Sequence, residues 1–172
     1  MLFVGVCLAA QSNTVGMARA DDDEILLGRF KRGEEAAFDE IVLRFQHEIA
    51  DLARRLLAWP GDVDDVVQEV FLAVYLNLRR FRGESSLKSW IFSSTVNTCR
   101  TRERKRLRFV RKRSRAVPAD QSLAAAGLTA EAHQSLHQTV WRLPMKYREP
   151  IVLKYLQELP TDQICRILGI SR

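Results

Sequence analysis

One segment of the chain places an aromatic ring, amide and hydroxyl groups, and cations at helical spacing. Within residues 87–115, steps of three and four put these side chains on one helix face: Trp90, Ser94, Asn97, Arg100, Thr101 and Arg104. Further cations follow close by at Arg102, Lys105, Arg106 and Arg108. Bases stack on such a ring, polar groups contact base edges, and cations neutralise phosphates, so the segment predicts binding to single-stranded DNA. A core tryptophan followed by a solvated basic tail explains the same residues equally well.

The preceding helical segment, residues 63–80, has an acidic side. Its valines form an apolar stripe, whereas other positions carry Asp64, Asp65, Gln68, Glu69 and Leu72. A protein partner could dock on these residues. Acidic residues in a first helical turn also stabilise the helix dipole without any partner, and from this segment alone that structural explanation is preferred.

The end of the chain has the pattern of a helix followed by a tight turn. A short helix capped by Thr161 would bury Ile164 and Ile167, Gly169 would make the turn, and Ser171 would cap a following helix. This is the first half of a helix-turn-helix, although generic helical hairpins share the spacing. Because the sequence stops at Arg172, we expect the motif to be incomplete.

The periodicity that positions these segments predicts an all-α fold of two small helical domains joined by a flexible linker. The expected boundaries are 1–20 for a disordered or misassigned start, 21–115 for the first domain, 116–128 for the linker and 129–172 for the second domain. The expected helices cover 21–31, 35–58, 63–80, 87–115, 129–143, 148–156 and 161–168. Pro150 then falls in a first helical turn, where its missing N–H is tolerated.

Composition narrows the class of protein. The net charge of +6 suits a polyanionic partner, but many solvated surfaces are equally basic. The three cysteines, Cys7, Cys99 and Cys165, form no close pair and predict reduced thiols in a cytoplasmic protein. The apolar stretch 2–10 has no preceding Lys or Arg and is too short to cross a bilayer, so we expect no membrane insertion.

Catalytic and cofactor motifs are absent from the sequence, and we expect neither enzymatic activity nor a cofactor. His133 and His137 have a metal-binding spacing, but no nearby thiol or carboxylate completes such a site. Gly28 and Gly33 have phosphate-loop spacing, but Glu34 follows where a lysine is required.

Together the segments resemble the extracytoplasmic-function (ECF) group of bacterial RNA polymerase sigma factors. The first domain carries the resemblance in Asp62–Tyr75 (DVDDVVQEVFLAVY), Phe81–Ile91 (FRGESSLKSWI) and Asn97–Arg100 (NTCR). The second domain carries it in Leu143–Tyr155 (LPMKYREPIVLKY) and in the segment from Thr161 to Ser171. The order and the spacing of the blocks also agree.

The resemblance implies a non-catalytic transcription initiation factor that binds polymerase core and melts the minus-ten promoter element. Implied polymerase contacts, to the clamp helices of the largest subunit, are Asp64, Asp65, Gln68, Glu69 and Leu72. Implied minus-ten contacts are Arg82, Gly83, Ser85, Lys88, Ser89, Trp90, Ser94, Asn97, Arg100, Thr101, Arg104 and Lys105. Implied minus-thirty-five contacts are Arg148, Thr161, Ser171 and Arg172. Promoter DNA, the polymerase flap and an anti-sigma factor would be further partners.

Two other interpretations stay open from the residues themselves. A sequence-neutral nucleic-acid-binding protein would use the basic helix alone, and its affinity would ignore promoter sequence. An interaction module would bind a partner protein through its acidic face and never touch DNA.

Overall fold

The computed structural model describes residues 22–57, 60–116 and 139–170, and every regular element in these ranges is helical. The first is a helix over residues 22–31. The next four are α2 (Ala36–Leu56), the 3-10 turn η1 (Pro60–Asp62), α3 (Val63–Leu78) and α4 (Leu87–Ala116). After a helical turn at 139–142 come α6 (Met145–Ile151), the π-helical turn η2 (Val152–Leu156) and α7 (Thr161–Leu168). The predicted all-α class is confirmed.

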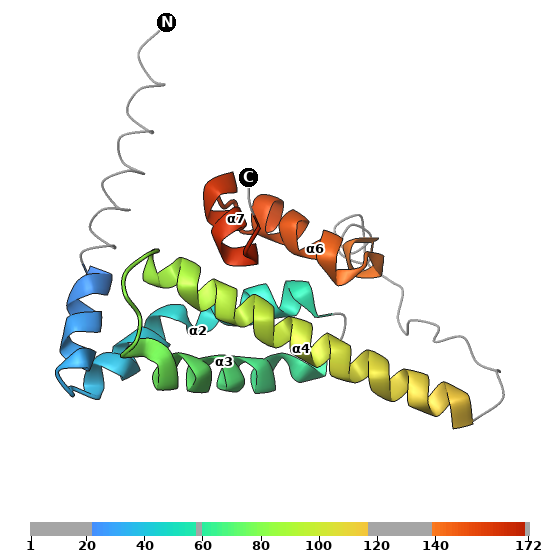
Figure 1. Cartoon of the computed structure of the whole chain (residues 1–172), viewed down its shortest axis with the longest axis horizontal. Helices are drawn as coiled ribbons and strands as arrows, with labels where there is room; N and C mark the ends of the chain where they lie inside the picture. Colours follow the sequence, from blue (N-terminus) through green and yellow to red (C-terminus); the bar gives the residue numbers. More distant parts are fainter. Residues whose placement is uncertain (1–21, 58–59, 117–138, 171–172) are drawn as a thin grey trace, which may run out of the picture.

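Helices α2, α3 and α4 form the larger half of the molecule (Figure 1). The apolar stripe of α2 is buried as its spacing predicts, with Ile41, Ile49 and Leu52 fully enclosed. Val66, Val70 and Val74 of α3 meet this stripe, and Ile91 and Phe92 of α4 complete the core. Burying each such side chain stabilises the fold by about 1.5–3 kcal/mol, so the three helices hold one another in fixed positions.

Local hydrogen bonds set where α4 begins. Gly83 adopts a left-handed backbone conformation, with φ of +76°, in the turn that follows α3. The Ser86 hydroxyl then accepts a hydrogen bond from the backbone N–H of Ser89 at 3.2 Å, which satisfies one of the N–H groups left open at a helix start. The first turn of α4, with the predicted nucleic-acid contacts that follow it, is thereby held in place.

The smaller half differs from prediction at its helix starts. Helix α6 begins at Met145 rather than at residue 148, because the extended backbone of Pro144 (ψ 142°) directly precedes it. Pro150 therefore lies beyond the first turn, and the helix widens into η2 right after it. Thr161 is an exposed first residue of α7 with no capping hydrogen bond, so the predicted cap is wrong. Gly169 makes the predicted turn, with φ of +67°.

The two halves pack against each other. Helix α7 lies on α4, and α6 and η2 contact α2 (Figure 1). Val152, Leu153, Ile164 and Ile167 belong to the same buried cluster as the core of the larger half. Hydrogen bonds cross the boundary as well: the Ser93 hydroxyl donates to the carbonyl of Ile167 at 3.0 Å.

Several predictions lie outside the described residues. They concern the segment before residue 22, residues 117–138 with His133 and His137, and the final pair Ser171 and Arg172. Within the described ranges, no helix is long and apolar enough to cross a membrane. The same ranges contain no cluster of three or more His, Cys, Asp or Glu side chains suited to a metal ion.

Candidate nucleic-acid interface

The predicted nucleic-acid face of α4 forms a stripe that is open to solvent along its middle. We call Trp90, Ser94, Asn97, Arg100, Thr101 and Arg104 the polar stripe. Asn97, Thr101 and Arg104 are exposed, while Trp90, Ser94 and Arg100 are half-buried. The hydroxyls of Ser94 and Thr101 donate to backbone carbonyls one turn earlier, at 3.2 and 3.0 Å. Their oxygens keep acceptor capacity for an incoming base.

A cavity of about 340 Å³ opens beside the start of the stripe. It is lined by Ala73, Asn77, Arg80, Phe81, Trp90 and Ser94. Phe81 and Trp90 stack at a tilt, with ring centroids 5.1 Å apart, so aromatic surface forms one wall. The volume lies at the lower end of the range of about 300–1,000 Å³ typical of ligand pockets. An aromatic wall beside an amide and a guanidinium provides stacking and hydrogen bonding together.

Sequence reasoning missed three of these lining residues. Ala73 and Asn77 belong to the end of α3, for which the sequence predicts only core packing and polymerase contact, and Arg80 lies in the turn that follows α3. The four-residue spacing of Ala73 and Asn77 was a usable signal, because it puts them on one helix face.

Arg100 is held by the smaller half of the molecule. Its Nε and Nη2 donate to the two carboxylate oxygens of Glu149 at 2.7 and 2.5 Å. Only 3% of the Glu149 side chain is exposed, against 28% for Arg100. This bidentate bond raises the pKa of Arg100 above its usual value. Arg100 Nη1 also donates to the Asn97 amide oxygen at 3.3 Å.

The turn before α4 differs from prediction in part. Arg82 and Gly83 are exposed, and Ser85 is half-buried. Lys88 pairs with Glu48 of α2 at 2.6 Å, and its ammonium lies 5.2 Å from the Phe92 ring centroid. Ser89 was predicted to contact DNA, but it is 5% exposed and hydrogen-bonded to Ser86 at the helix start. In this structure Ser89 has a structural role.

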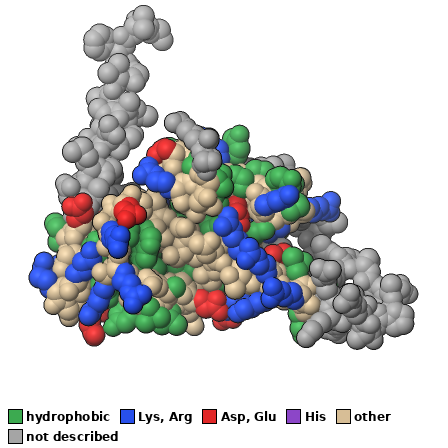
Figure 2. Space-filling view, in the orientation of Figure 1, with side chains coloured by type: hydrophobic (Ala, Val, Ile, Leu, Met, Phe, Trp, Pro, Cys, Tyr) green, Lys and Arg blue, Asp and Glu red, His purple; other side chains and the backbone are tan. Residues whose placement is uncertain are grey.

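Beyond the stripe, α4 continues as a basic rod. Arg104, Lys105 and Arg106 are exposed there, beside the exposed apolar side chains of Leu107 and Phe109. Lys and Arg side chains form a band on the right of the space-filling view, with acidic side chains next to its lower end (Figure 2). Such a band attracts a phosphate backbone whatever its base sequence.

The predicted acidic residues of α3 face solvent together. Asp64, Asp65, Gln68, Glu69 and Leu72 are all exposed, and 60% of Leu72 is accessible. Two of the carboxylates already have an internal cation, because Arg102 Nη2 lies 2.8 Å from Glu69 and Nη1 lies 3.4 Å from Asp65. The hydrogen bond to Glu69 is the main cause of a raised Arg102 pKa.

Arg148 was predicted to contact duplex DNA, but the structure buries it. The side chain is 4% exposed, and its guanidinium donates to the carbonyls of Leu56 at 2.5 Å and Leu143 at 2.9 Å. A third acceptor is the carbonyl of Trp141. Burial lowers the pKa of Arg148. Arg148 joins α2 to the smaller half in this arrangement, whereas Thr161 is exposed.

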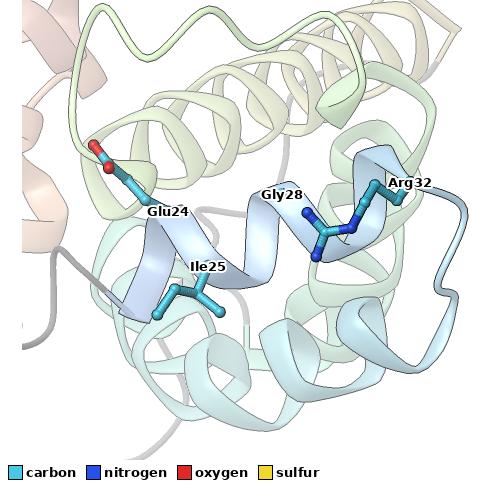
Figure 3. A pocket seen from close by; sticks show the side chains of 4 residues that line it. All are labelled: Glu24, Ile25, Gly28 and Arg32. Carbon is cyan, nitrogen blue, oxygen red and sulfur yellow. The ribbon is translucent and has the colours of Figure 1, made fainter.

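A second hollow, of about 380 Å³, has fewer groups that could bind a base or a phosphate. Its lining residues are Glu24, Ile25 and Gly28 of the helix at 22–31 and Arg32, which directly follows that helix (Figure 3). No aromatic ring lines the hollow; the Arg32 guanidinium lies back over Gly28, and the Glu24 carboxylate points outward at the other end of the helix (Figure 3). The surfaces of α3 and α4 are therefore the candidate functional site.

Comparison with known proteins identifies both halves. Residues 41–115 match the family described as Sigma-70 region 2, and residues 133–172 match Sigma-70, region 4. The chain is 29% identical over 165 residues to the ECF RNA polymerase sigma-E factor of Escherichia coli (strain K12), covering 85% of this chain and 82% of that protein. It is also 29% identical over 166 residues to the RNA polymerase sigma-H factor of Pseudomonas aeruginosa, covering 88% and 85%.

A solved structure has the same arrangement of helices. It is CnrH in complex with the cytosolic domain of CnrY, with a TM-score of 0.62 and 26% sequence identity, covering 87% of this chain and 84% of that one. Both family regions occur in the order that sigma factors have, and the two matched ranges contain the sequence blocks that carry the resemblance. The chain belongs to the ECF group of the sigma-70 family and is a transcription initiation factor.

Proposed function

We propose that this sigma factor uses two adjacent surfaces, an acidic polymerase face on α3 and a base-capturing face on α4. The observation that carries the proposal is the 340 Å³ cavity whose aromatic wall, Phe81 and Trp90, stands at the start of the polar stripe. A sequence-neutral binder needs only the basic rod of α4. A cavity with aromatic, amide and guanidinium groups offers, in addition, a place for one base to be read.

The polymerase face consists of Asp64, Asp65, Gln68, Glu69 and Leu72. All five side chains are exposed on one helix, which supports docking of the clamp helices of the largest polymerase subunit. Protein interfaces commonly have an apolar centre surrounded by polar and charged groups, and Leu72 among four polar or acidic side chains has this composition. Complementary charge would steer the encounter and fix the register, and Leu72 would supply apolar contact area.

The base-capturing face takes the non-template strand of the minus-ten element. One base would leave the stack and enter the cavity, where Trp90 and Phe81 stack on it and Asn77 or Ser94 contacts its edge. Unstacking costs a few kcal/mol, which stacking at about 1–3 kcal/mol per base can offset together with hydrogen bonds. Asn97 and Thr101 would contact the bases that follow, and Arg104 and Lys105 the phosphates. Arg82, Gly83, Ser85 and Lys88 would border the entrance.

The smaller half would act on the duplex at the minus-thirty-five element and on the polymerase flap, with Thr161 on its exposed side. We further propose that an anti-sigma factor regulates the protein, since CnrH is solved in a complex with a domain of another protein. This work would take place in the cytoplasm without catalysis by the chain itself.

Single-residue variants of the stripe test the base-capturing face. Asn97→Ala should weaken binding to a minus-ten non-template oligonucleotide by roughly five- to a hundredfold, the effect of one lost base contact. It should leave the melting temperature unchanged, because Asn97 is exposed. Lys105→Gln is the matched control and should weaken binding to every sequence alike, with a shallower salt dependence. Equal losses of Asn97→Ala on matched and scrambled oligonucleotides would favour the sequence-neutral alternative.

Charge reversal tests the polymerase face. Asp64→Lys together with Gln68→Lys adds like charges opposite a basic partner while sparing the residues that hold Arg102. Binding to core polymerase should weaken by tenfold or more, since like-charge contacts across an interface cost several kcal/mol. A folded double variant with unchanged core affinity would refute the assignment of this face.

A further inference from the structure

The polymerase face carries its own counter-ion. Arg102 of α4 reaches across to α3, where Nη2 lies 2.8 Å from Glu69 and Nη1 lies 3.4 Å from Asp65 and 3.9 Å from Asp62. A single guanidinium thus lies among three carboxylates. Asp64, one position from Asp65, has no cation within ion-pair distance in the part of the chain that the structure describes.

The carboxylates beside Arg102 are still accessible from outside. The side chain of Asp65 is 62% exposed and that of Glu69 is 45% exposed, whereas Arg102 itself is 22% exposed. The guanidinium therefore lies beneath the acidic surface, and a partner's cations would approach from the opposite side. Any such cation must share or replace a bond that Arg102 already makes.

There is also room for a partner group at this point. A hollow of about 490 Å³ lies where α3 and α4 meet, lined by Asp62, Glu69, Arg102, Lys105, Arg106 and Phe109. A long cationic side chain of a partner could enter it and reach Glu69. The positive charges of Lys105 and Arg106 would oppose that entry, as Arg102 does.

We propose that Arg102 sets the affinity and the selectivity of the polymerase face by competing with the partner's cations for Asp65 and Glu69. This inference rests on the proposed role of the α3 face. A weakly basic surface cannot displace a guanidinium that is already in place, whereas a partner with several well-placed cations can. Competition of this kind excludes wrong partners at some expense in affinity for the correct one.

The competition predicts a gain of binding when Arg102 is removed. Ion pairs of this exposure contribute about 0.2–1 kcal/mol each, so releasing two carboxylates corresponds to roughly two- to thirtyfold in affinity. Arg102→Gln should therefore bind core polymerase more tightly than wild type. Its binding should also depend more steeply on salt, because the face has gained one net negative charge. A purely structural role for Arg102 predicts the opposite, a loss of binding.

The experiment measures the dissociation constant for core polymerase at several salt concentrations. Arg102→Met keeps the aliphatic stem and gives a second variant without the charge, while Arg102→Lys keeps the charge and should stay near wild type. Arg108→Gln is the matched control, because it removes the same charge from the same helix at an exposed position that does not line the hollow. Tighter binding and a steeper salt slope for both uncharged variants, but not for the control, support the inference. Unchanged or weaker binding of the folded uncharged variants overturns it.

The same measurements separate this inference from the proposed function. If Asp64→Lys with Gln68→Lys leaves core binding intact, the α3 face is not the polymerase face, and both ideas fail. If that double variant loses binding while Arg102→Gln gains none, the face is correct and only the competition is wrong.

Discussion

The bond between Arg100 and Glu149 predicts that the smaller half restrains the nucleic-acid face of the free protein. Arg100 belongs to the polar stripe, yet both of its donors that point toward α6 are taken by Glu149, at 2.7 and 2.5 Å. Arg100 cannot simply turn away, because Glu149 is only 3% exposed and would be left as a buried charge without a partner. Release of Arg100 therefore requires the smaller half to move.

Glu149→Gln is the perturbation that isolates this restraint. Glutamine keeps the shape of the side chain but loses the charge, and its NH2 group meets a donor of Arg100 instead of accepting from it. A charge-assisted hydrogen bond contributes about 1.5–3 kcal/mol. We call the arrangement in which the smaller half has moved away from Arg100 the open arrangement, and we take it as the minor one in wild type. Its population should rise roughly ten- to a hundredfold in the variant, and the apparent affinity for single-stranded DNA should rise by the same factor.

The assay is fluorescence anisotropy with a labelled minus-ten non-template oligonucleotide at one fixed salt concentration. Asp162→Asn is the control, because it changes the net charge equally on the exposed side of α7, where Asp162 pairs with Arg166 of the same helix. Small-angle scattering of the free protein should show a larger radius of gyration for Glu149→Gln alone. The reasoning is refuted if Glu149→Gln stays folded, binds the oligonucleotide like wild type and scatters like wild type.

Three other predictions concern stability and reactivity. Phe92→Ala should lower the free energy of unfolding by about 3–5 kcal/mol in denaturant titrations, because Phe92 is fully buried, whereas Leu76→Ala should change it by under about 0.5 kcal/mol at a 65% exposed site. Burial raises the pKa of the Cys99 thiol to about 12, so peptide mapping after alkylation at pH 8 should find Cys99 unmodified in the native protein and modified only after unfolding. Gly169→Ala should cost about 1 kcal/mol through backbone strain alone, since φ is +67° and an added Cβ would meet nothing within 4 Å; an unchanged melting temperature would contradict this.

Features set by neighbouring residues were predictable from the sequence. The stripe of Ile41, Phe45 and Ile49 predicted the ends of α2 to within two residues, because a three- and four-residue period of apolar residues is specific to an α-helix. The turn at Gly169 was predictable from the residue type, since glycine adopts a left-handed conformation without strain. The acidic side of α3 was equally visible, because it depends on one helix alone.

Features set by contacts between residues far apart in the sequence were not predictable. Arg100 and Glu149 are 49 positions apart, and no spacing rule connects them. Arg148 looks like a DNA contact in a basic protein, but the carbonyls that surround it come from α2 and from the segment before α6. The role predicted for Ser89 differs from the structure for another reason. A serine three residues after a capping serine can hydrogen-bond at the helix start as readily as it can contact a ligand.

Arg100 of the polar stripe and the nearby Arg102 are both bound by carboxylates of the same chain. Arg100 is bound by Glu149 of the smaller half, and Arg102 by Asp65 and Glu69 of the polymerase face. Free protein therefore presents Asn97, Thr101 and Arg104 of the stripe to solvent, with part of the positive charge of α4 neutralised. An arginine that pairs with an internal carboxylate in the free protein affects binding of DNA or polymerase when that pair breaks. Such coupling between two interactions acts equally in both directions. Removing Glu149 should thus favour DNA, and removing Arg102 should favour polymerase, although both substitutions break ion pairs of one helix.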